Sequence, residues 1–188
     1  MNRRWVVVLA IVLVAGTAAA AAFWPTPRRR AVARVAELDG MFREESEEDA
    51  EGGQHPVVSV TLAFRTVGSA DLALLRDIRP LHRIYLDGST VTDADLADLD
   101  ECDTLDVLSL SVTKVTDAGL VHVAKHPNLR VLNIRKTQVS DAGLVHLRGL
   151  SRLATLNVWE SNVTTRGLGE LRRSIPGLRD DMSATDDD

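Results

Sequence analysis

The sequence predicts an α/β fold: a short solenoid of about five 24-residue strand–helix units with a parallel concave sheet, preceded by one transmembrane helix. Three observations predict it. Apolar residues recur with a constant step of 24 from residue 57 onward. Within each unit the spacing of these residues changes from two to three, and an uncharged run of 20 residues lies near the amino terminus.

The uncharged run extends from Trp5 to Trp24 and is followed by three arginines, Arg28 to Arg30. Twenty helical residues cover about 30 Å, the thickness of a bilayer's hydrocarbon core, and Trp side chains favour the interface. We therefore expect residues 1–24 to be an uncleaved anchor and the protein to be a single-pass membrane protein. The balance of arginines favours a cytoplasmic carboxyl side, whereas the short amino-terminal head favours the opposite, so sidedness stays open.

An alternative interpretation treats the same segment as a signal peptide. Five consecutive alanines, Ala18 to Ala22, offer a cleavage site before Phe23. Cleavage there would give a secreted or periplasmic repeat protein.

Residues 25–56 are predicted to be a linker that is first basic and then acidic. The stretch 31–42 has the pattern of a short helix, while 43–55 holds six acids and almost no apolar residue. Such a segment cannot bury a core, so we interpret it as a charged, extended spacer. Residues 179–188 are interpreted in the same way, as a disordered acidic tail.

The overall charge disfavours nucleic acid as a partner. All 27 acidic side chains lie after residue 36, against 16 of the 22 basic ones. Phosphate binding gains most of its affinity from Lys and Arg. A single Cys and 4% aromatic residues also disfavour disulfide scaffolds, cysteine zinc modules and stacking platforms.

The repeat occupies residues 57–178 as five blocks that begin at residues 57, 81, 105, 129 and 153. Positions 1, 4, 6, 11, 16 and 19 of every block are apolar. Positions 4 and 6 share one face of a strand, and positions 16 and 19 share one face of a helix. One such unit is too small to bury its own apolar residues, so the units are expected to stack with their strands in a parallel sheet.

In the last four blocks the predicted helix opens with a hydroxyl residue that can accept from free backbone amides, mostly followed by an Asp placed to meet the helix dipole. The openings are Thr92-Asp93, Thr116-Asp117, Ser140-Asp141 and Thr164-Thr165. Gly119, Gly143 and Gly167 follow. Glycine weakens a helix, so we expect a tight first turn or close contact with the neighbouring block there.

These motifs resemble the leucine-rich-repeat family, whose pattern LxxLxLxxNxL is matched by LDVLSLSVTKV at 105–115 and LRVLNIRKTQV at 129–139. The continuations VTDAGL at 115–120 and VSDAGL at 139–144 are similar to the short subtype of ribonuclease-inhibitor-like and F-box-associated repeats. The resemblance implies protein binding on the concave sheet. In the first block Arg65 stands in the Asn column and Gly68 replaces the capping hydroxyl, so residues 57–80 are expected to be a cap-like first repeat. Where the family usually has Asn, this chain has shorter hydroxyl residues, so the ladder of side-chain hydrogen bonds should be made by hydroxyls or be absent: Ser89, Thr113, Thr137 and Ser161.

Strand residues between the buried ones point to the concave side and form the candidate site for a protein or peptide partner. Trp159, Tyr85 and Arg135 are the expected anchors because such side chains dominate interface energetics. Trp159 could instead pack on the last repeat as part of a carboxyl-terminal cap. The candidate residues are Arg83, Tyr85, Asp87, Ser109, Asn133, Arg135, Asn157 and Trp159.

We expect a non-enzymatic protein without cofactor or metal, since the sequence holds no phosphate loop, nucleophile elbow or paired-cysteine motif. A zinc site can be drawn from His122, His126 and His146. His126 falls in a column that should be buried and the other two in one that should be solvated, so they should point apart. Cys102 is expected to be a core residue and not a nucleophile.

Overall fold

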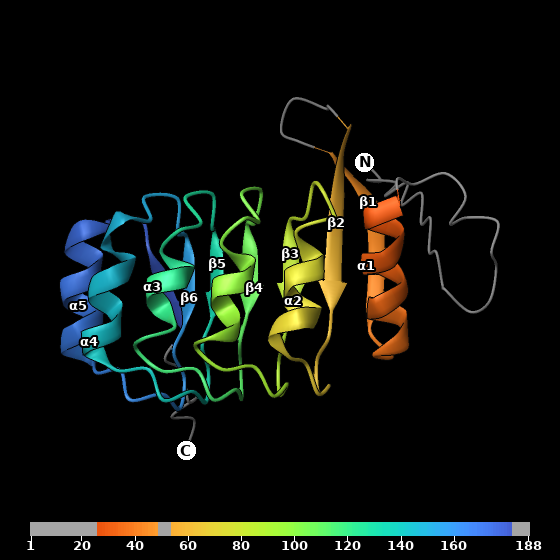
Figure 1. Ribbon diagram of the computed structural model, residues 1–188. Coiled ribbons are helices and arrows are strands. Elements are labelled where there is room, and N and C mark those ends of the chain that lie inside the picture. The colour runs from red at the N-terminus through yellow and green to blue at the C-terminus, as the bar shows by residue number, and fades with distance from the viewer. Residues whose placement is uncertain (1–25, 49–53, 182–188) are drawn as a thin grey trace, which may run out of the picture.

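The computed structural model describes residues 26–48 and 54–181, and within them seven strands form one sheet in chain order from β1 to β7. β1 (Met41–Glu48) pairs antiparallel with β2 (Gln54–Thr61), and every later pair is parallel. The helices line one side of the strands (Figure 1). The later strands have three residues each: β3 (Arg83–Tyr85), β4 (Val107–Ser109), β5 (Val131–Asn133), β6 (Thr155–Asn157) and β7 (Arg179–Asp181).

The predicted transmembrane segment, residues 1–24, lies outside the described residues. Among the helices of residues 26–48 and 54–181, none has the length and apolarity that a membrane crossing requires.

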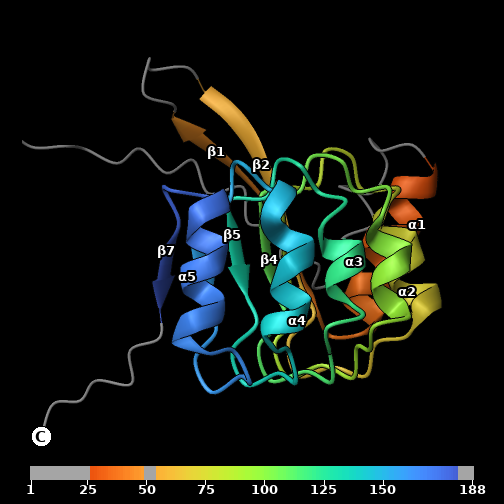
Figure 2. The same cartoon turned by 90° about the vertical axis from the view of Figure 1, so that its left-hand side faces the viewer.

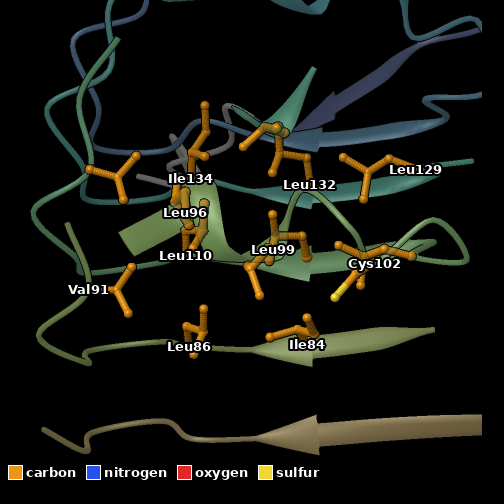
Figure 3. Packing of buried hydrophobic residues seen from close by; sticks show 14 of the residues in the cluster. Ile84, Leu86, Val91, Leu96, Leu99, Cys102, Leu110, Leu129, Leu132 and Ile134 are labelled. Atoms are coloured by element: carbon orange, nitrogen blue, oxygen red, sulfur yellow. The ribbon is translucent and has the colours of Figure 1, made fainter. Parts of the chain in front are cut away.

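The core consists of the six apolar columns that the sequence predicts. All thirty side chains in these columns are buried, with no more than 9% of any residue exposed. The fourth and sixth residues of a block leave the strand on the same side, as Ile84 and Leu86 do in Figure 3, and meet helix-side residues such as Leu96 and Leu99. The eleventh column is dry throughout and confirms the stacked architecture: Val67, Val91, Val115, Val139 and Val163.

The helical segments of the second and third repeats are short. The second block has only a turn followed by a 3₁₀ segment, and the third has four helical residues. Packed α-helices need about 8–10 Å between axes, whereas paired strands lie about 4.8 Å apart, so narrower turns relieve the mismatch. The segments are α2 (Ser69–Leu75), η2 (Asp95–Leu99), α3 (Leu120–Val123), α4 (Asp141–Leu144), η3 (Val145–Gly149) and α5 (Thr165–Ser174).

The amino-terminal end of the stack is covered by α1 (Thr26–Glu37) and β1, so the linker predicted for 25–56 is wrong for 26–48 and 54–56. Ala31, Val32 and Val35 of α1 and Phe42 of β1 join the core. The acids of β1 are accommodated because only one face of a strand must be apolar, and charged residues protect an edge strand. Since α1 and β1 form the end, residues 57–80 are an internal repeat and not the cap.

The β1–β2 hairpin rises beyond the other strands and leans away from α1, α2 and α3 (Figure 2). Arg28 of α1 pairs with Glu44 of β1 at 3.2 Å, and Arg34 of α1 pairs with Asp71 of α2 at 2.7 Å. These ion pairs join the covering elements to one another and to the first repeat.

The carboxyl-terminal end also extends further than expected. Leu178 is buried, and β7 pairs with β6 in the register of a sixth repeat. Arg172 of α5 forms an ion pair with Asp180. The tail predicted for 179–188 is therefore wrong for 179–181, and residues 182–188 lie outside the described part.

In the first two blocks, the turn that opens the helical segment is capped from within the same block. The backbone N–H of Gly68 donates to Asp71 Oδ2 at 3.1 Å. In the second block, both the N–H and the hydroxyl of Thr92 donate to Asp95 Oδ2, at 2.9 and 2.7 Å. We call this the self-capped mode.

In the last three blocks the corresponding acceptor comes from the preceding block. Asp117 accepts from the N–H of Ser140 at 2.7 Å and from its hydroxyl at 2.6 Å. We call the three such carboxylates the aspartate ladder. The hydroxyls of Thr116, Ser140 and Thr164 also accept from backbone N–H groups of their own helical segments, as the sequence predicts. The ladder pairs are Asp93 with Thr116, Asp117 with Ser140 and Asp141 with Thr164.

The three helix glycines are explained by the same ladder. A Cβ on Gly119 would lie 2.5 Å from Asp93 Oδ1, and one on Gly143 would lie 3.0 Å from the Cα of Asp117. Gly167 has the same relation to Asp141. The predicted close contact with the neighbouring block is thus confirmed, and the neighbour is an aspartate.

The hydroxyl residues in place of the family's Asn make no ladder. Thr113, Thr137 and Ser161 each donate to a carbonyl three residues earlier in their own repeat, at 2.6 to 2.7 Å. They therefore close a turn inside the repeat, whereas the aspartate ladder forms side-chain bonds between repeats.

Candidate functional site on the open sheet face

The candidate residues lie on the sheet face opposite the core, which we call the open face. Along each strand they alternate with buried residues: Arg83, Tyr85 and Asp87 flank Ile84 and Leu86. The structure therefore places all eight on one face, as the sequence predicts. Seven are half-buried, and Ser109 is buried at 5% exposure.

A row of polar side chains crosses the middle of the open face. The Ser109 hydroxyl donates to Asp87 Oδ1 at 2.5 Å, and the amide Nδ2 of Asn133 donates to the Ser109 oxygen at 3.0 Å. Asn133 Oδ1 in turn accepts from the backbone N–H of Arg135 at 3.1 Å. These bonds fix the orientation of the row before any partner arrives.

At the amino-terminal end of the open face, Arg83 is already neutralised. Its guanidinium lies 2.7 Å from a carboxylate oxygen of Glu47 on β1 and 3.9 Å from Asp106. Burial opposes the charged form of Arg83, but the bond to Glu47 raises its pKa above the ordinary value. Burial also raises the pKa of Asp106.

At the carboxyl-terminal end, Arg135 and Trp159 come together. The Arg135 guanidinium carbon lies 4.0 Å from the centroid of the Trp159 ring, and the Lys136 ammonium lies 5.2 Å from it. Lys136 is also paired with Glu160 at 2.8 Å. Trp159 therefore packs against cations of the preceding repeat and is half-buried.

Two residues near the open face were missed by sequence reasoning. Glu47 was assigned to the linker because its acidic surroundings hid a strand. Lys136 occupies the eighth position of its block, where the backbone is left-handed with φ of 54°. The signal for that turn was Gly88 at the equivalent position, which has φ of 64°.

The three histidines do not converge. His126 is 1% exposed, and its Nδ1 lies 3.2 Å from the carbonyl of Cys102, while His122 lies 3.1 Å from Asp100 and His146 is exposed. Burial lowers the pKa of His126. No group of three His, Cys, Asp or Glu side chains within 26–48 and 54–181 could hold a metal ion.

Cys102 is buried and is a free thiol. Burial raises its pKa from 9.0 to about 11, so the thiolate is scarce at neutral pH. The structure places it in the core, as expected.

A crevice on the helix side, between η3 and α5, encloses only about 10 Å³ and is lined by Leu144, Arg148 and Glu170 among others. That is about the space of one water molecule. It lies on the helix side and contains none of the open-face residues.

No protein-family model matches the chain, and no curated protein matches it. Among solved structures, the chain is similar to the leucine-rich-repeat ectodomain of the receptor kinase SOBIR1 from Arabidopsis thaliana. The identity is 16%, the match covers 83% of this chain and 91% of that one, and the TM-score is 0.54. The fold is that of a leucine-rich-repeat protein.

Two bacterial leucine-rich-repeat structures match less closely. A Leptospira interrogans protein shows 16% identity over 58% of this chain with a TM-score of 0.45, and this chain spans only 27% of it. An internalin of Listeria monocytogenes shows 16% identity over 64% of this chain and 39% of its own, with a TM-score of 0.44. Both TM-scores are below 0.5, so these two matches add nothing to the likeness in fold.

Proposed function

We propose that this leucine-rich-repeat protein is a non-enzymatic protein-protein interaction module that binds a polypeptide on the open, concave side of its sheet. Residues 5–24 hold it at a membrane. The observation that carries the proposal is the arrangement of Tyr85, Arg135 and Trp159 on a rigid sheet with their side chains directed away from the core.

The leucine-rich-repeat neighbours support this role because proteins of this fold typically serve in protein interactions. The SOBIR1 ectodomain, which shares the fold, is part of a receptor kinase. The repeats here are of the short VTDAGL type in sequence, and the aspartate ladder gives that motif a physical role in stacking.

The open face also has the composition of an interface. Aromatic and Arg side chains bury a large area at low cost in conformational entropy, and hydrogen bonds already orient the polar groups between them. The partner contact is expected to be modest, below about 800 Å² on each side, because the sheet is narrow.

The test is capture of a partner from membranes by the full chain, followed by binding of that purified partner to variants. Trp159→Ala combined with Tyr85→Ala should weaken binding at least tenfold while leaving the thermal midpoint nearly unchanged. Val121→Ala combined with Val145→Ala is the matched control, because both valines are exposed on the helix side. Equal loss in both double variants would exclude the open face as the site.

The membrane part of the proposal has its own test. Intact cells should retain the full-length chain in membranes after carbonate extraction. A mature protein that begins at Phe23 would show release by cleavage instead, and protease accessibility in intact cells would show on which side the repeats lie.

A further inference from the structure

We infer that the carboxyl-terminal end of the open face is a carboxylate-binding site and that the partner segment it takes is an acidic peptide. The inference rests on the proposed function and names the chemistry of its partner. We call the site the Arg135 clamp, defined by Arg135, Lys136, Asn157 and Trp159.

The first argument is the charge of Arg135. Within the described part of the chain, no carboxylate oxygen lies within ion-pairing distance of its guanidinium, and its Nε is buried without a hydrogen-bond partner. Glu160, the acid of the same turn, is paired with Lys136. Arg83, the corresponding cation at the other end of the face, already has Glu47.

The second argument is geometry. The guanidinium carbon of Arg135 lies over the Trp159 ring, 4.0 Å from its centroid. Stacking uses the face of a guanidinium but leaves the N–H groups at its edge, and those are the groups that form paired bonds to a carboxylate. The stack therefore holds Arg135 in place with its donors unused.

The third argument is the polarity of Asn157. Its Oδ1 accepts from the backbone N–H of Trp159 at 3.1 Å. This bond fixes the orientation of the amide and leaves Nδ2 as the group that can still donate a hydrogen bond. In the preceding repeat, the equivalent Nδ2 of Asn133 donates to Ser109. Among the described residues, no acceptor fills that role for Asn157, so its donor is available to a ligand.

Together these groups offer donors and positive charge, while the acceptors Asn133 Oδ1 and Asn157 Oδ1 are both occupied by backbone N–H groups. A ligand that matches must bring acceptors and negative charge. On a protein-binding face, side-chain carboxylates of an acidic peptide supply both.

The experiment uses the full chain in detergent and two fluorescein-labelled ten-residue peptides, one of alternating glutamate and glycine and one with glutamine in place of glutamate. Fluorescence anisotropy should show the glutamate peptide binding at least about tenfold tighter, and Arg135→Ala should remove most of that difference. Arg166→Ala is the matched control, because Arg166 is 87% exposed on α5 and its loss changes the net charge equally. It should change the affinity less than about twofold.

Arg135→Lys separates the clamp from simple charge. It keeps the cation but loses the planar fork and the stack on Trp159, so its affinity should fall nearly as far as that of Arg135→Ala. Unchanged thermal midpoints in both variants would show that the sheet is intact.

Several outcomes would overturn the inference. They are equal affinity for the two peptides, equal loss with Arg135→Ala and Arg166→Ala, or no binding of the glutamate peptide up to about 1 mM. If captured partners still depend on Trp159 and Tyr85, the proposed function survives that failure and only the acidic class is wrong. A gain in peptide affinity on changing Asp186, Asp187 and Asp188 to Asn would show the chain's own carboxyl end to be the occupant and would overturn a separate partner.

Discussion

The first two repeats and the last three solve the same problem in different ways. Each must satisfy the free amide and hydroxyl groups where its helical segment begins. The first two use an Asp from their own block, Asp71 and Asp95. The last three use a carboxylate from the block before. A self-capped block keeps its bonds when its neighbour moves, whereas a ladder block loses them, so the last three repeats should unfold more cooperatively.

The difference also links two positions in sequence. A ladder Asp at position 13 of one block demands a Gly at position 15 of the next, because a Cβ there would meet the carboxylate. The first block has Ser69 at position 13, and the second block can therefore carry Asp95 at position 15. The VTDAGL motif is thus a two-block arrangement and not a property of one helix.

The largest effect should come from closing the space that the ladder needs. Gly143→Ala places a Cβ against the backbone and carboxylate of Asp117, and it should lower the free energy of unfolding by about 2–4 kcal/mol. Urea denaturation of the full chain measures it. Gly169→Ala is the control, because nothing lies within 4 Å of its added Cβ. That change should instead stabilise α5 by about 1 kcal/mol. Loss of stability in both variants would contradict the ladder explanation.

A smaller loss is expected from removing the ladder acceptor itself. Asp117→Ala leaves the N–H and hydroxyl of Ser140 without their acceptor, at a cost of about 1–3 kcal/mol. Asp95→Ala removes the acceptor of Thr92 within one block and should cost about 1 kcal/mol, as for an ordinary helix cap. Urea unfolding should also broaden in Asp117→Ala only, and a similar broadening in both would show that the two modes do not differ.

Combining Asp117→Ala with Gly143→Ala tests whether the two residues act through the same contact. When Asp117 is already Ala, the Cβ of Gly143→Ala loses its worst contact. The double variant should therefore be more stable than the sum of the single effects predicts, by about 1–2 kcal/mol. Strict additivity in urea unfolding would mean that Gly143 and Asp117 act independently.

The smallest effect concerns His126, the buried ionisable group of the third block. Its pKa is lowered by burial from an ordinary value of 6.5. The stability contributed by neutral His126 is thus present above pH 6.5 and is lost as pH falls from there towards the folded-state pKa. His126→Leu, which copies Leu150 in the next block, should lessen the loss of stability between pH 7.5 and 5.5. The free energy of unfolding that the substitution saves cannot exceed about 1.4 kcal/mol per pH unit. If the variant and the unchanged chain lose the same unfolding free energy between pH 7.5 and 5.5, this prediction is contradicted.

The repeat was predictable because its information is redundant. Six apolar columns repeated five times outweigh any irregularity in one block, and every predicted core residue is buried. The open-face residues follow from the same register, since Arg135 and Trp159 must alternate with Ile134 and Val158. Their position could therefore be derived, although the stacking of one on the other could not.

The covering elements were not predictable by the same route. Phe42 is the only buried residue of the segment 41–47, which is otherwise mostly polar. Arg179–Asp181 contains no apolar residue at all. Both segments become strands because a neighbouring strand offers backbone hydrogen bonds, which a count of apolar residues does not detect. The ladder was missed for a related reason, since an Asp after a capping hydroxyl normally serves its own helix.

Thr165 stands in the last block where the three preceding blocks carry a ladder Asp. Duplication of the third or the fourth 24-residue unit would preserve every ladder donor and acceptor, because each of these two units receives one carboxylate and supplies another. A unit added after residue 176 would find a threonine where it needs an anion. The array can therefore lengthen from within by simple copying, while growth at its far end requires a Thr165→Asp change first.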